Sequence, residues 1–191
     1  MVDFDKIWVE KYRPKTLSDI ILDNRTLEII KEFKDEIPNL LFVGNPGTGK
    51  TTLAQIIVND ILKCNYLYIN ASDESGIDTI RHNITNFAQT KSFDGKVKVV
   101  ILDEADGLTT QAQSALRNTM ETYAKYCRFV LTANYKHKII PALQSRCQAL
   151  DIKPVVESAV KRCYNILKNE NITVPEEQKK KFIQLVKRHF P

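Results

Sequence analysis

Residues 44–51 read Gly44-Asn45-Pro46-Gly47-Thr48-Gly49-Lys50-Thr51, and this stretch decides the fold. It is the complete pattern G-x-x-x-x-G-K-[ST] of a phosphate-binding loop. The apolar run at 40–43 predicts a buried strand before it, and residues 50–62 predict a helix after it. In that setting the backbone wraps a phosphate, Lys50 reaches the outer phosphates, and the Thr51 hydroxyl holds Mg²⁺. The alternative, a plain Gly/Pro turn before a helix, is disfavoured because all four fixed positions are present.

A second run supplies acidic groups. Residues 97–102 are almost continuously apolar, which is typical of a strand covered on both faces, and they lead into Asp103-Glu104-Ala105-Asp106. Ligands of open α/β sheets bind at the carboxyl ends of strands, so Asp103 is a candidate Mg²⁺ ligand, direct or through water. Glu104 is the candidate base that polarises the attacking water. Alone, these acids would fit a solvated turn equally well; together with the loop they favour nucleotide hydrolysis. The letters D-E-A-D also occur in helicases, which need two nucleotide-binding domains where this length accommodates one.

The chain alternates predicted strands and helices, which favours an α/β fold with a parallel, five-stranded sheet covered by helices. Predicted strands are 40–43, 66–70, 97–103, 129–132 and 149–152; predicted helices are 24–36, 50–62, 77–90, 110–123 and 139–144. After Pro154 two further segments, 156–169 and 176–189, have helical spacing. We therefore expect a nucleotide-binding domain at 1–153 and a small helical domain at 154–191.

Composition narrows the class of protein. The 191 residues are 43% hydrophobic and 27% charged, which predicts a soluble chain with a real core. The net charge of +5 permits contact with a polyanion without demonstrating it. Cys64, Cys127, Cys147 and Cys163 lack zinc-ligand spacing and are expected to be reduced. No apolar run approaches the ~20 residues of a membrane span, and no signal peptide is visible, so a cytoplasmic location is the default expectation.

Several further segments occur together in one family. Residues 8–14, Trp8-Val9-Glu10-Lys11-Tyr12-Arg13-Pro14, resemble the N-terminal motif of replication clamp-loader ATPases. Residues 70–78 (NASDESGID), 132–134 (TAN) and 145–147 (SRC) resemble the segment after the second strand, the first sensor and the motif that names this branch of the AAA+ superfamily. The chain is thus similar to small subunits of replication factor C, and residues 85–95 look especially like the ATPase subunit of T-even-type phage clamp loaders.

The resemblance assigns roles to the nucleotide site. It implies that Val9, Glu10, Lys11, Tyr12 and Ile21 line the adenine and ribose pocket, and that Thr52 joins residues 44–51 in holding ATP. Asn134 would bind the γ-phosphate or the attacking water, although an Asn that simply closes a strand fits the residues too. Arg146 would reach the ATP site of a neighbouring subunit, where a guanidinium offsets charge on the transferred phosphoryl group. A plain surface arginine is its alternative.

The resemblance also implies macromolecular partners. Helices opened by Gly76, Ile77 and Arg81, and by Thr110, Gln113 and Arg117, would track the backbone of primer–template DNA. Intramolecular pairing or coupling across subunits is the alternative for the two arginines. Phe93 would dock on the sliding clamp, unless it folds back on its own helix.

These features predict an ATPase subunit of a DNA-replication clamp loader that uses ATP and Mg²⁺ to load a sliding clamp onto primer–template DNA. The resemblance implies an assembly of five subunits without a membrane partner, in the cytoplasm, the nucleus of a eukaryote or the host cytoplasm of a phage. The family pattern continues past residues resembling 189–191 with a second-sensor arginine and a collar domain, so the helical domain is expected to be incomplete. The alternatives are another DNA-associated AAA+ remodeller or initiator, and a non-hydrolysing structural subunit.

Overall fold

The computed structural model describes residues 7–34, 37–72, 77–90, 95–153 and 155–190. Its centre is a parallel sheet of five strands in the order β2-β3-β4-β1-β5. The strands are β1 (Leu40–Val43), β2 (Tyr66–Asn70), β3 (Lys98–Asp103), β4 (Cys127–Ala133) and β5 (Gln148–Asp151). The predicted sheet is confirmed, with strand ends that differ from the predicted ends by at most two residues.

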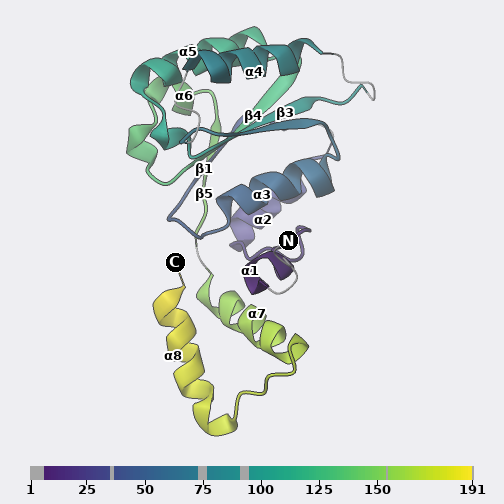
Figure 1. Cartoon of the computed structure of the whole chain (residues 1–191), viewed down its shortest axis with the longest axis vertical. Coiled ribbons are helices and arrows are strands. Elements are labelled where there is room, and N and C mark those ends of the chain that lie inside the picture. Colours follow the sequence, from purple (N-terminus) through teal and green to yellow (C-terminus); the bar gives the residue numbers. More distant parts are fainter. Residues whose placement is uncertain (1–6, 35–36, 73–76, 91–94, 154, 191) are drawn as a thin grey trace.

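Helices cover both faces of the sheet (Figure 1). On one face α4 (Ile77–Gln89) and α5 (Thr110–Thr122) pack on alternate strand residues such as Leu41, Leu102 and Leu131. On the other face α2 (Asn24–Lys31) and α3 (Lys50–Ile56) pack on the residues between them, such as Phe42 and Ile101. The apolar strand runs therefore split by side-chain alternation into two cores, as expected for a sheet buried on both sides.

Several helix bounds differ from those predicted. The helix predicted at 24–36 ends at Lys31, because the chain turns there to bury Ile37 and enter β1. The helix predicted at 50–62 changes after α3 into a π-helix, η2 (Ile57–Ile61), in which Ile57 and Val58 stay buried. Short elements that were not predicted are α1 (Trp8–Lys11), η3 (Ala105–Gly107) and η4 (Lys136–Lys138); the helix predicted at 139–144 is α6 (Pro141–Gln144).

The C-terminal helices form a hairpin beside the N-terminal segment (Figure 1). They are α7 (Val156–Asn169), a short turn η5 (Glu176–Gln178) and α8 (Lys179–His189). The rings of Tyr164 and Phe182 lie 4.6 Å apart between their centroids and join α7 to α8. No helix among the described residues has both the length and the apolar character that a membrane crossing needs.

Candidate nucleotide-binding site

The phosphate loop joins β1 to α3 in the predicted way. Gly44 cannot carry a side chain, because a Cβ there would lie 2.5 Å from the carbonyl oxygen of Ile152. Gly49 directly precedes the helix with φ of +89°, a left-handed conformation that favours glycine. Both of these motif positions thus require glycine, Gly44 because of the close carbonyl and Gly49 because of its backbone conformation. The loop that they shape lies at the carboxyl end of β1.

Lys50 is buried within this loop, with only 7% of its surface exposed. Its Nζ donates to the carbonyl oxygens of Gly44 at 2.8 Å and Asn45 at 2.9 Å, and to Asn134 Oδ1 at 2.8 Å. Burial lowers the pKa of Lys50, and the negative charge of Asp103, among other nearby carboxylates, opposes that shift. The contact brings together two predicted site residues that lie 84 positions apart in the chain.

Asp103, at the end of β3, accepts hydrogen bonds from three hydroxyl groups. Thr51 Oγ1 lies 2.8 and 2.9 Å from its two carboxylate oxygens, Thr132 Oγ1 lies 2.5 Å from Oδ1, and Tyr68 OH lies 2.7 Å from Oδ2. Thr51 and Asp103 were each predicted to hold Mg²⁺, and the structure places the two side chains in contact. Tyr68 was not predicted, because only the sheet order reveals that β2 runs beside β3.

The donor set at this point suits Mg²⁺. The ion prefers oxygen ligands and is commonly held by one or two carboxylates together with substrate phosphates. The hydroxyl of Thr51 and the carboxylate of Asp103 meet beside the phosphate loop and supply such oxygens. Among the described residues no group of three or more His, Cys, Asp or Glu side chains is arranged to hold a metal.

Glu104 follows in a left-handed backbone conformation with φ of 55°. Its amide donates to Thr132 Oγ1 at 3.0 Å, and its Oε2 lies 2.7 Å from the hydroxyl of Ser72. The Ser72 hydroxyl also lies 2.8 Å from Asn70 Oδ1, at the end of β2. Ser72 thus holds the carboxylate that sequence reasoning assigned as the base, and it was not itself predicted as a site residue.

A cavity of about 280 Å³ lies beside the phosphate loop. One wall is residues 8–22, which we call the base-wall segment, and the others come from the loop, α3, α7 and the C-terminal end. The lining includes the predicted residues Val9, Tyr12, Ile21, Gly47, Thr48, Gly49 and Thr52, and the unpredicted Arg13, Pro14, Asp19, Ile20, Arg162 and Phe190.

Two predicted pocket residues do not line this cavity. Glu10 pairs instead with Arg13, with an N–O distance of 2.5 Å, and Lys11 pairs with Glu170 at 2.6 Å. Both belong to α1, a single turn that presents only part of its surface to the cavity, and its Val9 lines the cavity. Their side chains thus point to other partners in this structure, and the assignment of Glu10 and Lys11 to the adenine and ribose pocket stays a prediction.

Arg146 contacts residues of its own chain. Its Nε donates to Glu121 Oε1 at 2.7 Å, the same carboxylate forms an ion pair with a terminal nitrogen, and another terminal nitrogen donates to the Ala142 carbonyl at 2.7 Å. The side chain is one-third exposed, at 34%. It is thus held on the α5–α6 side by an exposed carboxylate, an arrangement that leaves it able to exchange partners.

The predicted DNA contacts divide into three groups. Arg81 and Thr110 are exposed on α4 and α5, and Arg117 is half-buried and donates to Asn118 Oδ1 at 2.7 Å. Gln113 is 2% exposed, and its amide bonds the backbone of Leu108, Lys138 and Ile140. Gln113 therefore joins α5 to two loops and is not placed to meet DNA. Gly76, Phe93 and the side chain of Ile77 lie outside the described residues.

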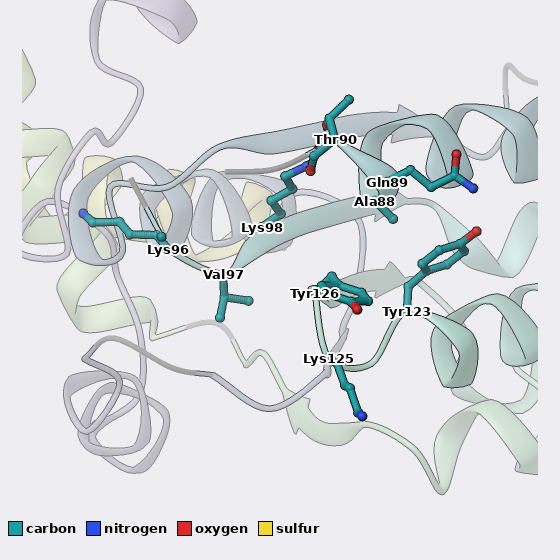
Figure 2. A pocket seen from close by; sticks show the side chains of 10 residues that line it. Ala88, Gln89, Thr90, Lys96, Val97, Lys98, Tyr123, Lys125 and Tyr126 are labelled. Atoms are coloured by element: carbon teal, nitrogen blue, oxygen red, sulfur yellow. Dashed lines mark hydrogen bonds between the residues drawn. The ribbon is translucent and has the colours of Figure 1, made fainter. Parts of the chain in front are cut away.

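A larger cavity of about 540 Å³ lies away from the phosphate loop and Asp103 and is lined by other residues (Figure 2). It sits between the end of α4, the start of β3 and the residues after α5, so it is at the opposite end of β3 from Asp103. The Nζ of Lys98 on its wall is engaged with the Phe87 carbonyl at 2.7 Å and Thr90 Oγ1 at 2.7 Å. That lysine anchors the end of α4, and we assign the cavity no chemistry from the lining residues that the structure describes.

Comparisons with known proteins agree with this geometry. A family model described as "ATPase family associated with various cellular activities (AAA)" matches residues 40–154. The chain is 44% identical over 180 residues to replication factor C small subunit from Archaeoglobus fulgidus, covering 90% of this chain and 56% of that protein. It is 42% identical over 186 residues to replication factor C subunit 3 from Saccharomyces cerevisiae, covering 93% and 55%. The chain thus spans about half the length of the curated relatives it matches.

Solved structures share the fold at lower identity. The RuvB Holliday junction branch migration motor of Thermotoga maritima matches with a TM-score of 0.66 and 18% identity, covering 93% of this chain and 64% of that one. At this identity the likeness shows the architecture alone. The sequence-based resemblance to replication factor C small subunits is confirmed by the curated relatives, and the α/β fold by the family model and the structural neighbours.

Proposed function

The chain belongs to the family of ATPases associated with various cellular activities, and on that premise we propose that it is the ATPase part of a clamp-loader subunit. The observation that carries the proposal is the meeting of Lys50, Thr51, Asp103, Glu104 and Asn134 at one edge of the sheet. That site would bind ATP, and its hydrolysis would be coupled to the handling of a ring-shaped clamp on primer–template DNA. We place the nucleotide-binding domain at 1–153 and the helical domain at 154–191.

Each residue has a role that follows from its position. Lys50 would exchange its three oxygen partners for phosphate oxygens of ATP. Burial disfavours the charged form of this ammonium group, and the negative phosphates would favour it again. Thr51 and Asp103 would hold Mg²⁺, which when bound neutralises charge between the outer phosphates. Asn134, released by Lys50, would be free to orient the γ-phosphate or the water.

Glu104 would act as the base. Its carboxylate would leave the Ser72 hydroxyl and accept a proton from the water that attacks the γ-phosphate of the bound ATP. The backbone at Glu104 is left-handed, and the bond from its amide to Thr132 Oγ1 fixes this residue directly after β3. Arg146 would leave Glu121 and act on the ATP bound by a neighbouring subunit.

The test of hydrolysis is Glu104→Gln, with Glu177→Gln as a control at an exposed carboxylate of the helical hairpin. We expect Glu104→Gln to bind ATP within about threefold of the original chain and to lose turnover by at least about a hundredfold, as removal of a general base does. The Glu177→Gln chain should behave as the original. Unchanged turnover in Glu104→Gln would mean that this subunit is a structural one.

The clamp, DNA and neighbouring subunits are proposed as partners by similarity to the replication factor C relatives. Exposed Arg81 and Thr110, together with Arg117, are the DNA candidates retained, and their contacts would be to backbone phosphates and therefore sensitive to salt. A location in the cytoplasm, or in the nucleus of a eukaryote, would follow from that role.

A mixing experiment tests the role of Arg146. In the assembled complex, Arg146→Ala and Glu104→Gln chains should each be inactive alone. Mixed, they should recover activity, because a site with intact Glu104 then faces a neighbour with intact Arg146. No recovery would show that Arg146 does not act across the interface. If neither a sliding clamp nor primer–template DNA changes the rate of ATP turnover, the result would favour a different AAA+ remodeller.

A further inference from the structure

Two side chains hold the base-wall segment: Arg162 of α7, which also lines the cavity, and Glu170, the residue directly after α7. Arg162 donates from one terminal nitrogen to the Tyr12 carbonyl at 3.0 Å and from the other to the Asp19 carbonyl. Glu170, which caps the end of α7, accepts at Oε1 from Tyr12 OH at 2.6 Å and from Lys11 Nζ at 2.6 Å. We call these four contacts the α7 clasp.

The clasp fixes the wall at defined points. Tyr12 is held at both of its ends, by Arg162 at the backbone carbonyl and by Glu170 at the ring hydroxyl. Arg162 bridges carbonyls seven positions apart, so it also sets how the segment folds back between Tyr12 and Asp19. Tyr12, Asp19 and Arg162 all line the 280 Å³ cavity, and the contacts therefore determine its shape.

The two clasp residues share a rigid support. They lie eight positions apart on or at the end of α7, which is about two turns of helix, so they move together. Ala159 anchors α7 in the core, and the Tyr164–Phe182 contact joins it to α8. Any shift of the helical hairpin is thus transmitted to the base wall.

We propose that Arg162 and Glu170 are positioning residues that form the base-binding wall of the nucleotide site and make affinity for the nucleoside depend on the seating of the helical hairpin. This inference rests on the proposed binding of ATP. The phosphate loop has its own supports in Gly44, Gly49 and Lys50, and the clasp contacts none of them. Loss of the clasp therefore weakens recognition of adenosine and leaves recognition of phosphates intact.

The experiment compares two ligands on the same chain. Isothermal titration with Mg²⁺ present measures the dissociation constants of ATP and of inorganic tripolyphosphate, which lacks the nucleoside. The variants are Arg162→Ala and Glu170→Gln, and their matched controls are Lys161→Ala, at the exposed position before Arg162, and Glu177→Gln, at an exposed carboxylate of η5. Glu170→Gln keeps an acceptor for Tyr12 OH and removes the ion pair with Lys11.

The expected changes differ between ligands. Arg162→Ala should raise the dissociation constant of ATP about tenfold, since two charge-assisted bonds to carbonyls are lost. Glu170→Gln should raise it about threefold, because the ion pair it removes is partly exposed. Tripolyphosphate affinity should stay within about twofold for both, and the controls should match the original chain for both ligands.

Trp8 supplies an independent readout. It is the single tryptophan, it lies in α1 of the base-wall segment, and it is 42% exposed. Its carbonyl accepts from the Tyr12 amide at 2.9 Å, so it reports on the residue that the clasp holds. Quenching of Trp8 by acrylamide should increase in Arg162→Ala and Glu170→Gln at temperatures well below unfolding.

Each outcome has a defined meaning. Equal weakening of ATP and tripolyphosphate, or no weakening of ATP, overturns the positioning role. If Arg162→Ala fails to fold, Glu170→Gln and Tyr12→Phe carry the same comparison, and unchanged ATP affinity in both overturns it. Failure of the original chain to bind either ligand refutes the proposed function itself, and the positioning role falls with it.

Discussion

Tyr68 offers the sharpest perturbation of the site. Its hydroxyl is one of three that bond Asp103, and Tyr68→Phe removes that atom alone. Thr51 and Asp103 would hold Mg²⁺ together, whereas Tyr68 and Thr132 would serve only to orient the carboxylate through their hydroxyl groups. The variant should therefore weaken the contribution of Mg²⁺ and leave the phosphate loop unchanged.

The magnitude follows from the type of bond. A hydrogen bond to a charged acceptor is worth ~1.5–3 kcal/mol, and the 40% exposure of Tyr68 favours the lower value. About 1.5 kcal/mol corresponds to about a tenfold rise in the Mg²⁺ concentration that half-saturates ATP turnover. Turnover at saturating Mg²⁺ should stay within about threefold, and the melting temperature should fall by about 3–6 °C.

The assay is a Mg²⁺ titration of ATP turnover at saturating ATP. Tyr66→Phe is the matched control, because Tyr66 lies two residues earlier on the same face of β2 and is similarly exposed at 38%. Equal Mg²⁺ dependence in the two variants would refute the reasoning, as would a loss in Tyr68→Phe that saturating Mg²⁺ does not restore.

Three further predictions concern the loop and the base. Ser72→Ala should raise basal ATP turnover severalfold in a steady-state assay, since Glu104 loses its resting partner; unchanged turnover would contradict that role. Gly44→Ala should cost ~1–3 kcal/mol in denaturant unfolding, because its Cβ meets the Ile152 carbonyl; neutral stability would contradict it. ATP affinity, measured from neutral pH upward, should fall as the pH rises through the lowered pKa of Lys50, because the phosphates bind the protonated ammonium group. Lys50→Arg should remove that fall, because arginine stays protonated.

The sequence sufficed where function depends on local pattern. The phosphate loop needs its glycines, Lys50 and Thr51 at fixed spacing between a strand and a helix, and that whole context lies within about 25 residues. Asp103 was found for the same reason, since a buried strand that ends in a carboxylate is visible in one dimension. The structure brings these groups together as expected.

Prediction failed where partners come from distant parts of the chain. Gln113 was assigned to DNA because the resemblance implies that the helix it helps to open tracks primer–template DNA, yet its amide is satisfied by the backbone of two loops. Tyr68 and Arg162 act through neighbours that only the sheet order and the packing of α7 define. No periodicity in the sequence encodes which strand lies beside β3 or which helix lies beside the base wall.

The sheet order has a consequence for how the protein acquires its fold. Strand β4 lies between β1 and β3, although it follows both in the chain, so Lys50 meets Asn134 only after the central strand has inserted. Pairings of such long sequence separation form late and slowly during folding. We therefore expect ATP, as a ligand of the completed site alone, to stabilise the native state by mass action and to raise the yield of folded chain when it is present during refolding.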